Sequence, residues 1–250
     1  MTAAKATYRK LSDTMAKYHI RSIYLLIILY VIVVGIMKPS FLQLDNWMNL
    51  LRSVSVYGII SCGITFVMLT GRTDLSAGMM LTFLATISCY FVTPGIENQL
   101  LAIVVPILLG AVGGLGNGIL VGVIRLNSFV STLGMMSLYT GFVLLFIKQS
   151  PSLFGSQDMT VYRFLGQGSI LGIPTPVIIL AIVAIVSSIV LRRTVYGARI
   201  YAVGSNASAA RYSGISPAAM LVSVYTVSGL LTGLGAVVMC SRILSAQPKL

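Results

Sequence analysis

The chain has 250 residues, of which 57 % are hydrophobic and 9 % are charged. A typical soluble domain carries about 25 % charged residues, so too few charges remain here to coat a soluble globule. The composition excludes a sizeable domain outside the membrane. The net charge of +12 indicates membrane topology rather than nucleic-acid binding, because cytoplasmic loops of membrane proteins are enriched in Lys and Arg.

The chain begins with a basic segment, residues 1–22, which carries five Lys or Arg and one acid. We expect it to be a cytoplasmic N-terminus. The next fifteen residues, Ile23 to Met37, are apolar and would be about 22 Å long as a helix. Arg21 and Lys38 flank this run and can reach the two interfaces of the bilayer. We therefore interpret residues 23–37 as an uncleaved first transmembrane helix.

Six further apolar runs follow, and turn residues separate most of them. The runs are continuous rather than alternating, which favours helices over a β-barrel. The sequence therefore predicts an all-α polytopic membrane protein with about seven transmembrane helices in a single domain, residues 23–250. The further runs are 50–70, 75–93, 100–124, 129–147, 175–191 and 218–240.

The distribution of basic residues predicts the orientation. With the N-terminus in the cytoplasm, the inside segments 1–22, 71–74, 125–128 and 192–217 hold eleven Lys or Arg. The remaining connections hold five, apart from Arg52 at a helix end. This bias follows the positive-inside rule, so we expect 192–217 to lie on the cytoplasmic side.

Catalytic motifs are absent from the sequence. The single histidine, His19, lies in the basic N-terminal segment, and no lysine follows a glycine as a phosphate-binding loop requires. The three cysteines show no CxxC spacing, so we interpret them as buried, inert thiols. We expect no enzyme activity, no catalytic residues, no metal site and no cofactor in this chain.

Glycines recur every four residues within the run 100–124. On a helix this spacing makes a groove in which a neighbouring backbone can approach closely. Gly229 and Gly233 repeat the arrangement in the last run. We predict tight helix packing along the groove, formed by Gly110, Gly114, Gly118 and Gly122.

Asp74 is the only acid within the apolar part of the chain, and it precedes a helical run at Leu75. It fits an N-cap residue, which accepts backbone N–H bonds at the positive end of the helix dipole. It also fits a pathway element, as intramembrane acids often do. Both interpretations stay open. The candidate pathway or gating residues are Asp74, Ser76, Asn117, Asn127 and Thr132.

The segment 192–217 holds four arginines and no acid. Asn206 is a good N-cap, Ala207 to Ser213 favours a helix, and Gly214 suits a left-handed C-cap. Seven helical residues span about 11 Å, too short to cross a bilayer. The segment is either an interfacial loop or a helix that docks onto a cytoplasmic subunit.

Four stretches resemble a known family. They are Leu69–Gly78 (LTGRTDLSAG), Asn117-Gly118, Phe129–Met135 (FVSTLGM) and, above all, Thr194–Ile215 (TVYGARIYAVGSNASAARYSGI). They are similar to the permease subunits of bacterial ATP-binding-cassette (ABC) sugar importers, in the group of ribose, xylose and arabinose permeases that includes autoinducer-2 permeases. The resemblance covers almost the whole chain from residue 23.

The resemblance implies a multi-pass protein of the bacterial inner membrane that works with partners. A second permease copy or homologue would complete a central pathway, a separate ATPase subunit would bind ATP, and a periplasmic solute-binding protein would deliver a sugar or similar small polar solute. The segment 204–215 corresponds to the cytoplasmic coupling region of the family. Relatives continue beyond Leu250 into further spans, so we expect the C-terminal helices of the family to be missing. The implied coupling residues are Gly204, Asn206, Ala209, Ala210, Arg211 and Gly214.

Two other functions remain as alternatives. An ion- or proton-coupled secondary carrier would need a titratable group in the membrane, and Asp74 is the sole candidate. A truncated remnant without transport activity would fit the early C-terminus.

Overall fold

The structure of the chain is a computed structural model that describes residues 24, 26–92, 96, 98–147 and 159–243. The basic segment 1–22 and His19 lie outside these residues. The chain forms two compact units, residues 1–50 and 51–250, and each is described by itself.

The first unit contains a short apolar helix, Leu26–Met37, and the 3-10 helix η1 (Pro39–Leu42). It also contains the first turns of α2 (Leu44–Leu69). Most side chains of the short helix are exposed, as expected of a helix whose surroundings are lipid. The turn between the helices is fixed locally, since Asn46 Nδ2 donates to the carbonyl of Phe41 at 2.9 Å.

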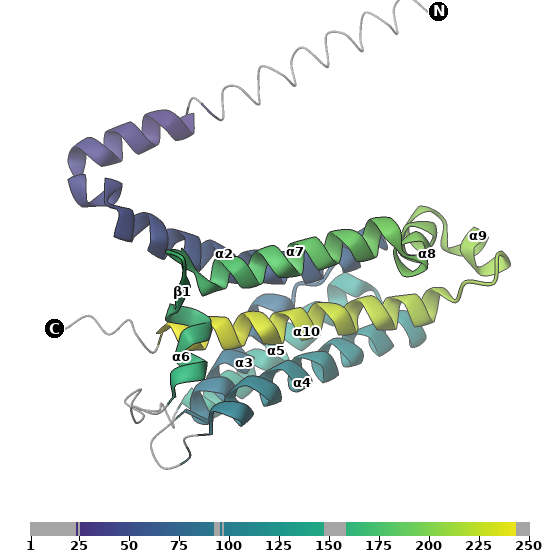
Figure 1. Cartoon of the computed structure of the whole chain (residues 1–250). Coiled ribbons are helices and arrows are strands. Elements are labelled where there is room, and N and C mark those ends of the chain that lie inside the picture. Colours follow the sequence, from purple (N-terminus) through teal and green to yellow (C-terminus); the bar gives the residue numbers. More distant parts are fainter. Residues whose placement is uncertain (1–23, 25, 93–95, 97, 148–158, 244–250) are drawn as a thin grey trace, which may run out of the picture. The chain divides into compact units, whose positions relative to one another are not determined.

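The second unit continues α2 and adds eight α-helices, one π-helical turn and one small hairpin within the described residues (Figure 1). The strands are two residues long and pair antiparallel, so the fold is all-α apart from this turn. The elements are α3 (Ala77–Tyr90), α4 (Gln99–Gly118), η2 (Ile119–Val123), α5 (Ser128–Ile147), α6 (Thr160–Gln167), β1 (Ser169–Ile170), β2 (Ile173–Pro174), α7 (Thr175–Arg193), α8 (Val195–Ser205), α9 (Ala207–Tyr212) and α10 (Pro217–Ile243).

The prediction of an all-α membrane protein is confirmed. In the described part of the chain, five helices are long and apolar enough to cross a membrane: α2, α4 with η2, α5, α7 and α10. The helices Leu26–Met37 and Ala77–Tyr90 are shorter and apolar. Each of the seven predicted runs therefore contains one apolar helix.

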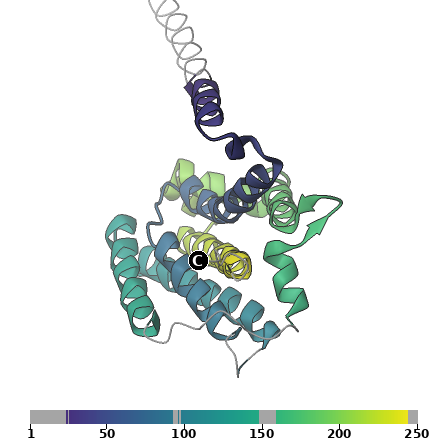
Figure 2. The same cartoon turned by 90° about the vertical axis from the view of Figure 1, so that its left-hand side faces the viewer.

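The centre of the second unit is α10 (Figure 2). It packs against α3, α4, α6 and η2. Of the most apolar 18-residue stretch of α10, 61 % is buried, whereas the corresponding value for α7 is 17 %. The difference separates a helix enclosed by protein from one that faces lipid. A helix that is apolar all round suits a buried position.

A seam of glycines brings α4 and α10 together. A Cβ on Gly110 or Gly114 would overlap a backbone carbonyl oxygen of α10, and one on Gly118 would lie 2.6 Å from the Cα of Val222. Gly229 faces α4 in the same way. Gly122 extends the seam, because its Cβ would lie 2.9 Å from the carbonyl oxygen of Ala218. Side chains larger than hydrogen would force the two backbones apart.

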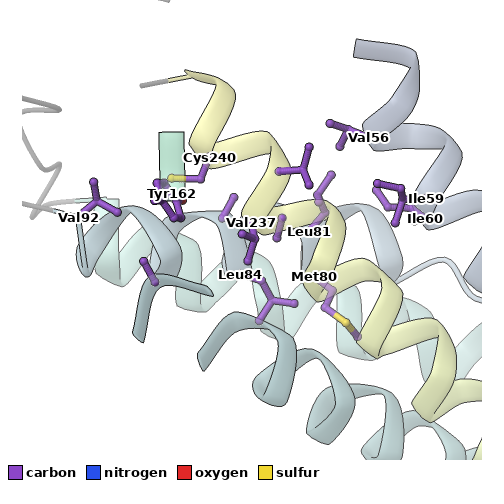
Figure 3. Packing of buried hydrophobic residues seen from close by; sticks show 14 of the residues in the cluster. Val56, Ile59, Ile60, Met80, Leu81, Leu84, Val92, Tyr162, Val237 and Cys240 are labelled. Atoms are coloured by element: carbon purple, nitrogen blue, oxygen red, sulfur yellow. The ribbon is translucent and has the colours of Figure 1, made fainter. Parts of the chain in front are cut away.

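The prediction that all three cysteines are free thiols is wrong. Cys89, near the end of α3, forms a disulfide with Cys240, near the end of α10, with a Cα–Cα distance of 6.0 Å. The two lie 151 residues apart, so no spacing motif reveals them. Cys62 alone is free. The disulfide borders the main core cluster, which includes Leu84, Tyr162 and Val237 (Figure 3).

The second unit has two distinct ends (Figure 1). The "α6 end" carries α6, the hairpin and the Cys89–Cys240 disulfide, and Tyr162 of α6 hydrogen bonds to Ser88 at 2.6 Å. The "α9 end" carries α8, α9 and the connections between α2 and α3 and between η2 and α5. The chain therefore crosses between the two ends along each long helix.

Candidate functional site

The short helix α9 is the centre of the candidate coupling site. Asn206 begins it in an extended conformation, and its Oδ1 accepts from the backbone N–H groups of Ser208 and Ala209, both at 3.0 Å. Gly214 follows the helix with a φ of +81°, a left-handed conformation that favours glycine. Residues 206–214 therefore form a short helix with defined ends.

Most of α9 is open to the surroundings. Ala210 is buried and packs with the second core cluster, which contains Val224 and Tyr225. Ala209 and Arg211 are exposed. One alanine anchors the helix, and the remaining face, made of small side chains and one arginine, is available for contact with another protein.

A second helix, α8, precedes α9 and was not expected from the sequence. Thr194 begins it, and the Thr194 Oγ1 accepts from the N–H of Gly197 at 3.2 Å. Ile200 and Val203 are buried on one face. The spacing of these two apolar residues, three positions apart, is the signal for this helix.

Three contacts fix α8 to the transmembrane helices. Ile200 and Val203 pack with Phe66 of α2 in the second core cluster. A Cβ on Gly204 would overlap the carbonyl oxygen of Leu69, so α8 touches the backbone at the end of α2. The Tyr196 hydroxyl donates to Ser223 Oγ of α10 at 2.9 Å. Burial raises the pKa of the Tyr196 phenol, which keeps this donor protonated.

Of the five candidate pathway residues, the structure brings three together. The Asp74 carboxylate accepts from the N–H of Ser76 at 3.0 Å and from its Oγ at 2.7 Å. Asn117 Nδ2 of α4 donates to the same Oγ at 2.8 Å. Ser76 and Asn117 are fully buried, and Asp74 is 9 % exposed. The three form a hydrogen-bonded chain between the α2–α3 connection and α4.

Asp74 differs from the N-cap position that the sequence suggested. Ser76 is the N-cap residue of α3, and its own side chain makes no capping bond. Asp74 supplies the acceptor from two residues earlier. The physical reason is that a carboxylate in a turn can reach the N–H two residues on, so the capping chemistry is retained at a shifted position.

Asn127 and Thr132 lie apart from this cluster. Asn127 is exposed before α5 and accepts from the N–H of Phe129 at 2.9 Å. Thr132 is fully buried, and its hydroxyl donates to the carbonyl of Ser128 at 2.8 Å. Both side chains therefore bond to their own helix or its first turn.

Tyr225 is a residue that the sequence reasoning missed. It lies on α10 and is fully buried, and its hydroxyl donates to the carbonyl of Thr73 at 2.8 Å. It therefore ties the α2–α3 connection, next to Asp74, to the central helix. The two residues are 152 positions apart, and one tyrosine in an apolar run gives no sign of its partner.

Known proteins give the class to which this architecture belongs. Residues 46–250 match the family described as "Branched-chain amino acid transport system / permease component". The ribose import permease protein RbsC of Bacillus subtilis (strain 168) is 36 % identical over 225 residues, which cover 90 % of this chain and 69 % of that protein. The chain belongs to this family of ABC transporter permeases, as its sequence motifs predicted.

Further relatives carry related names. The ribose import permease protein RbsC of Escherichia coli (strain K12) is 35 % identical over 91 % of this chain and 71 % of that protein. The L-arabinose ABC transporter permease protein AraH of Azospirillum brasilense is 33 % identical over 84 % of this chain and 61 % of that protein. No solved structure matches the chain. As a member of a permease family, the chain is a membrane-spanning component and does not itself hydrolyse ATP.

Proposed function

We propose that this chain is the permease component of an importer for a sugar, powered by a separate ATPase subunit. The observation that carries the proposal is the similarity to ribose import permeases over about 90 % of the chain. The exposed helix α9, which is fixed to the transmembrane helices through α8, supports the proposal because a cytoplasmic partner that binds such a helix can transmit movement to the transmembrane helices. Ribose is the first sugar to test.

We propose that the α9 end faces the cytoplasm of a bacterium and that the protein lies in the inner membrane. Two features of the second unit support this orientation. Basic residues gather at the α9 end, in agreement with the positive-inside rule; they are Arg72, Arg125, Arg192, Arg193, Arg199 and Arg211. The disulfide lies at the α6 end, and disulfides persist in the periplasm rather than in the cytoplasm.

The proposed coupling route runs from α9 through α8. The ATPase subunit, which holds the ATP, would contact the exposed residues of α9, including Ala209 and Arg211, with Ala210 as the anchor beneath them. Movement of α9 would reach α8 at Asn206, and α8 would pass it to α2 through Gly204 and to α10 through Tyr196. Gly214 would allow α9 to turn relative to α10.

We propose a gating role for the buried chain Asp74, Ser76 and Asn117. Ser76 and Asn117 are fully buried, so a sugar in the pathway would not contact them directly. Their proposed role is to hold the α2–α3 connection in place. Breaking and remaking these bonds would let α3 shift against α4. The glycine seam described above would keep α4 with α10 during that shift. Thr132 and Asn127 would belong to the adjoining start of α5.

The remaining partners follow from the proposed class. A periplasmic solute-binding protein would deliver the sugar at the α6 end, and a second permease, identical or homologous, would complete the pathway. Residues 23–50 would belong to the same permease domain as the rest of the chain, and lipid would cover the exposed apolar faces. Nucleic acid is not expected as a partner.

The proposal is tested by substituting an exposed residue of α9 in the complete transporter. Ala209→Trp adds bulk to the face that would meet the ATPase, while the backbone bonds of α9 remain possible. Val161→Trp is the matched control, because Val161 is 59 % exposed on α6 at the opposite end. We expect Ala209→Trp to reduce ATP-dependent ribose uptake in proteoliposomes at least tenfold and to reduce co-purification of the ATPase. Val161→Trp should leave co-purification unchanged.

Two results would contradict the proposal. Equal effects of the two tryptophan variants on co-purification would remove the role of α9. Uptake that continues without ATP, needs a proton gradient and is lost in Asp74→Asn would support a proton-coupled carrier instead. Both hydrogen bonds from Ser76 reach one oxygen of the Asp74 carboxylate, Oδ1, so this variant decides between the two functions.

A further inference from the structure

A pocket of about 780 Å³ opens at the α9 end. Its walls come from the α2–α3 connection, from η2 and the turn that follows it, from α9 and from the start of α10. Gly122 and Leu221 are among the residues of its apolar part. The volume lies within the range of about 300–1,000 Å³ that is typical of small-molecule sites.

Three arginines line this pocket: Arg72 of the α2–α3 connection, Arg125 of the turn after η2, and Arg211 of α9. No Asp or Glu is among its lining residues, so nothing in the wall neutralises them. Ser208 and Asn127 add polar atoms. Arginines that share one cavity without an acid make a site for an anion, because guanidinium groups bind the oxygens of phosphate and carboxylate in pairs.

The wall that carries Arg125 is a defined turn. Arg125 has a φ of +65°, a left-handed conformation that non-glycine residues adopt rarely. The turn is held by bonds from the N–H of Ile124 to the carbonyl of Ile119 and from the N–H of Leu126 to the carbonyl of Leu120, both at 3.0 Å. The arginine is therefore presented by an ordered backbone rather than by a loose loop.

We propose that this pocket binds a phosphate group, supplied by the headgroup of an anionic phospholipid or by a soluble phosphate compound. Basic pockets between transmembrane helices on the cytoplasmic side are a known setting for anionic headgroups. The proposal depends on the membrane location but not on the ATPase partner. A bound phosphate would link Arg211 of α9 to Arg72 and Arg125 of the transmembrane frame, and so would hold the coupling helix in place.

The test uses the full chain purified without an ATPase, in a neutral detergent. Arg72→Gln/Arg125→Gln removes two charges from the pocket wall. Arg192→Gln/Arg193→Gln is the matched control, because it removes two exposed charges from the end of α7, outside the pocket. Short-chain phosphatidylglycerol, short-chain phosphatidylcholine and inorganic phosphate are titrated separately, and binding is followed by native mass spectrometry and thermal shift.

We expect phosphatidylglycerol to bind the unmodified chain more tightly than phosphatidylcholine does. The pocket variant should weaken this binding about thirtyfold, since each basic residue near a membrane surface contributes a factor of about five. The control variant should weaken it less than about threefold. Tighter binding of inorganic phosphate than of phosphatidylglycerol would identify a soluble phosphate as the source, and the reverse order would identify the lipid headgroup.

A second readout does not depend on loss of charge. Ser208 lines the pocket, so Ser208→Cys in a Cys62→Ala background places a thiol on its wall. Bound phosphatidylglycerol or inorganic phosphate should slow modification of this thiol by a charged maleimide at least fivefold. Equal binding by the two double variants, or no binding of either phosphatidylglycerol or inorganic phosphate, would overturn the proposal.

Discussion

The two ends of the second unit are built in different ways. At the α6 end, a disulfide joins α3 to α10, and Tyr162 of α6 lies fully buried with a hydrogen bond to Ser88. At the α9 end, no cysteine is present in the described connections, most of α9 is exposed, and arginines surround a pocket. Both ends have a buried, hydrogen-bonded tyrosine, Tyr162 at the α6 end and Tyr225 at the α9 end, but only the α6 end has a covalent bond between helices.

This difference teaches where movement is easiest. A disulfide restrains the helices that it joins, whereas a short helix held by one buried alanine and its caps can shift at little cost. We therefore expect an applied force to move the α9 end while the α6 end stays fixed. Four substitutions test this expectation, one at the α6 end and three at the α9 end.

The largest effect is expected from removing the disulfide. Cys89→Ala/Cys240→Ala opens a loop of 151 residues, and the loss of such a cross-link costs up to about 5 kcal/mol of stability. The melting temperature in detergent should fall by many degrees, as measured by a thermal-shift assay. Cys62→Ala is the control and should change little, since Cys62 is free. Labelling of three thiols without a reductant would show that the bond does not form.

The next effect is expected at the contact between α8 and α2. Gly204→Val places a side chain onto the carbonyl oxygen of Leu69, and overpacking of this kind costs about 1–3 kcal/mol. Proteolysis should then cut near α8 faster than in the unmodified chain. Gly116→Val is the matched control, because a Cβ there meets nothing within 4 Å. Equal proteolysis of the two variants would contradict close packing at Gly204.

A smaller effect is expected from the cap of α9. Asn206→Ala removes the acceptor of the N–H groups of Ser208 and Ala209, and loss of an N-cap costs about 1 kcal/mol. Hydrogen exchange of the amides of α9 should quicken about fivefold. Asn206→Ser retains a capping oxygen and should stay near the unmodified rate. Unchanged exchange in Asn206→Ala would mean that the cap does not hold the helix.

The smallest effect is expected from Tyr196→Phe, which removes the bond to Ser223 at a cost of about 0.5–1 kcal/mol. The pH dependence identifies this bond. Burial raises the pKa of the Tyr196 phenol above its ordinary value of 10.0, so the folded state favours the protonated form. The stability that it contributes is present below pH 10 and fades as the pH rises further. The melting temperature of Tyr196→Phe should lie below that of the unmodified chain at pH 8, and the two values should approach each other above pH 10. A difference that stays constant with pH would contradict the assignment.

The sequence predicted the helices well because their signal is local. Continuous apolar runs mark spans wherever they occur, and the residues that end α9, Asn206 and Gly214, act through their immediate neighbours. The partners of Asp74 within its turn were also within reach of the sequence. The separate helix α8 was missed because its apolar face is short: it consists of Gly197, Ile200 and Val203.

Long-range partners could not be predicted from one sequence. The Cys89–Cys240 bond and the bond from Tyr225 to Thr73 each join residues more than 150 positions apart. The contact of Asn117 with Ser76 depends on the rotation of α4 about its own axis, which its apolar residues do not determine. The pocket with its three arginines depends on two connections and helix α9, which meet only in the folded chain.

The position of α10 has a consequence for the route of a solute. This helix fills the middle of its unit and touches the surrounding helices through glycine and buried side chains. A hydrophilic molecule therefore has no room to travel along the axis of this bundle. We expect the pathway of the solute to run along the outer surface of the unit, so that a neighbouring subunit would form the opposite wall of the channel.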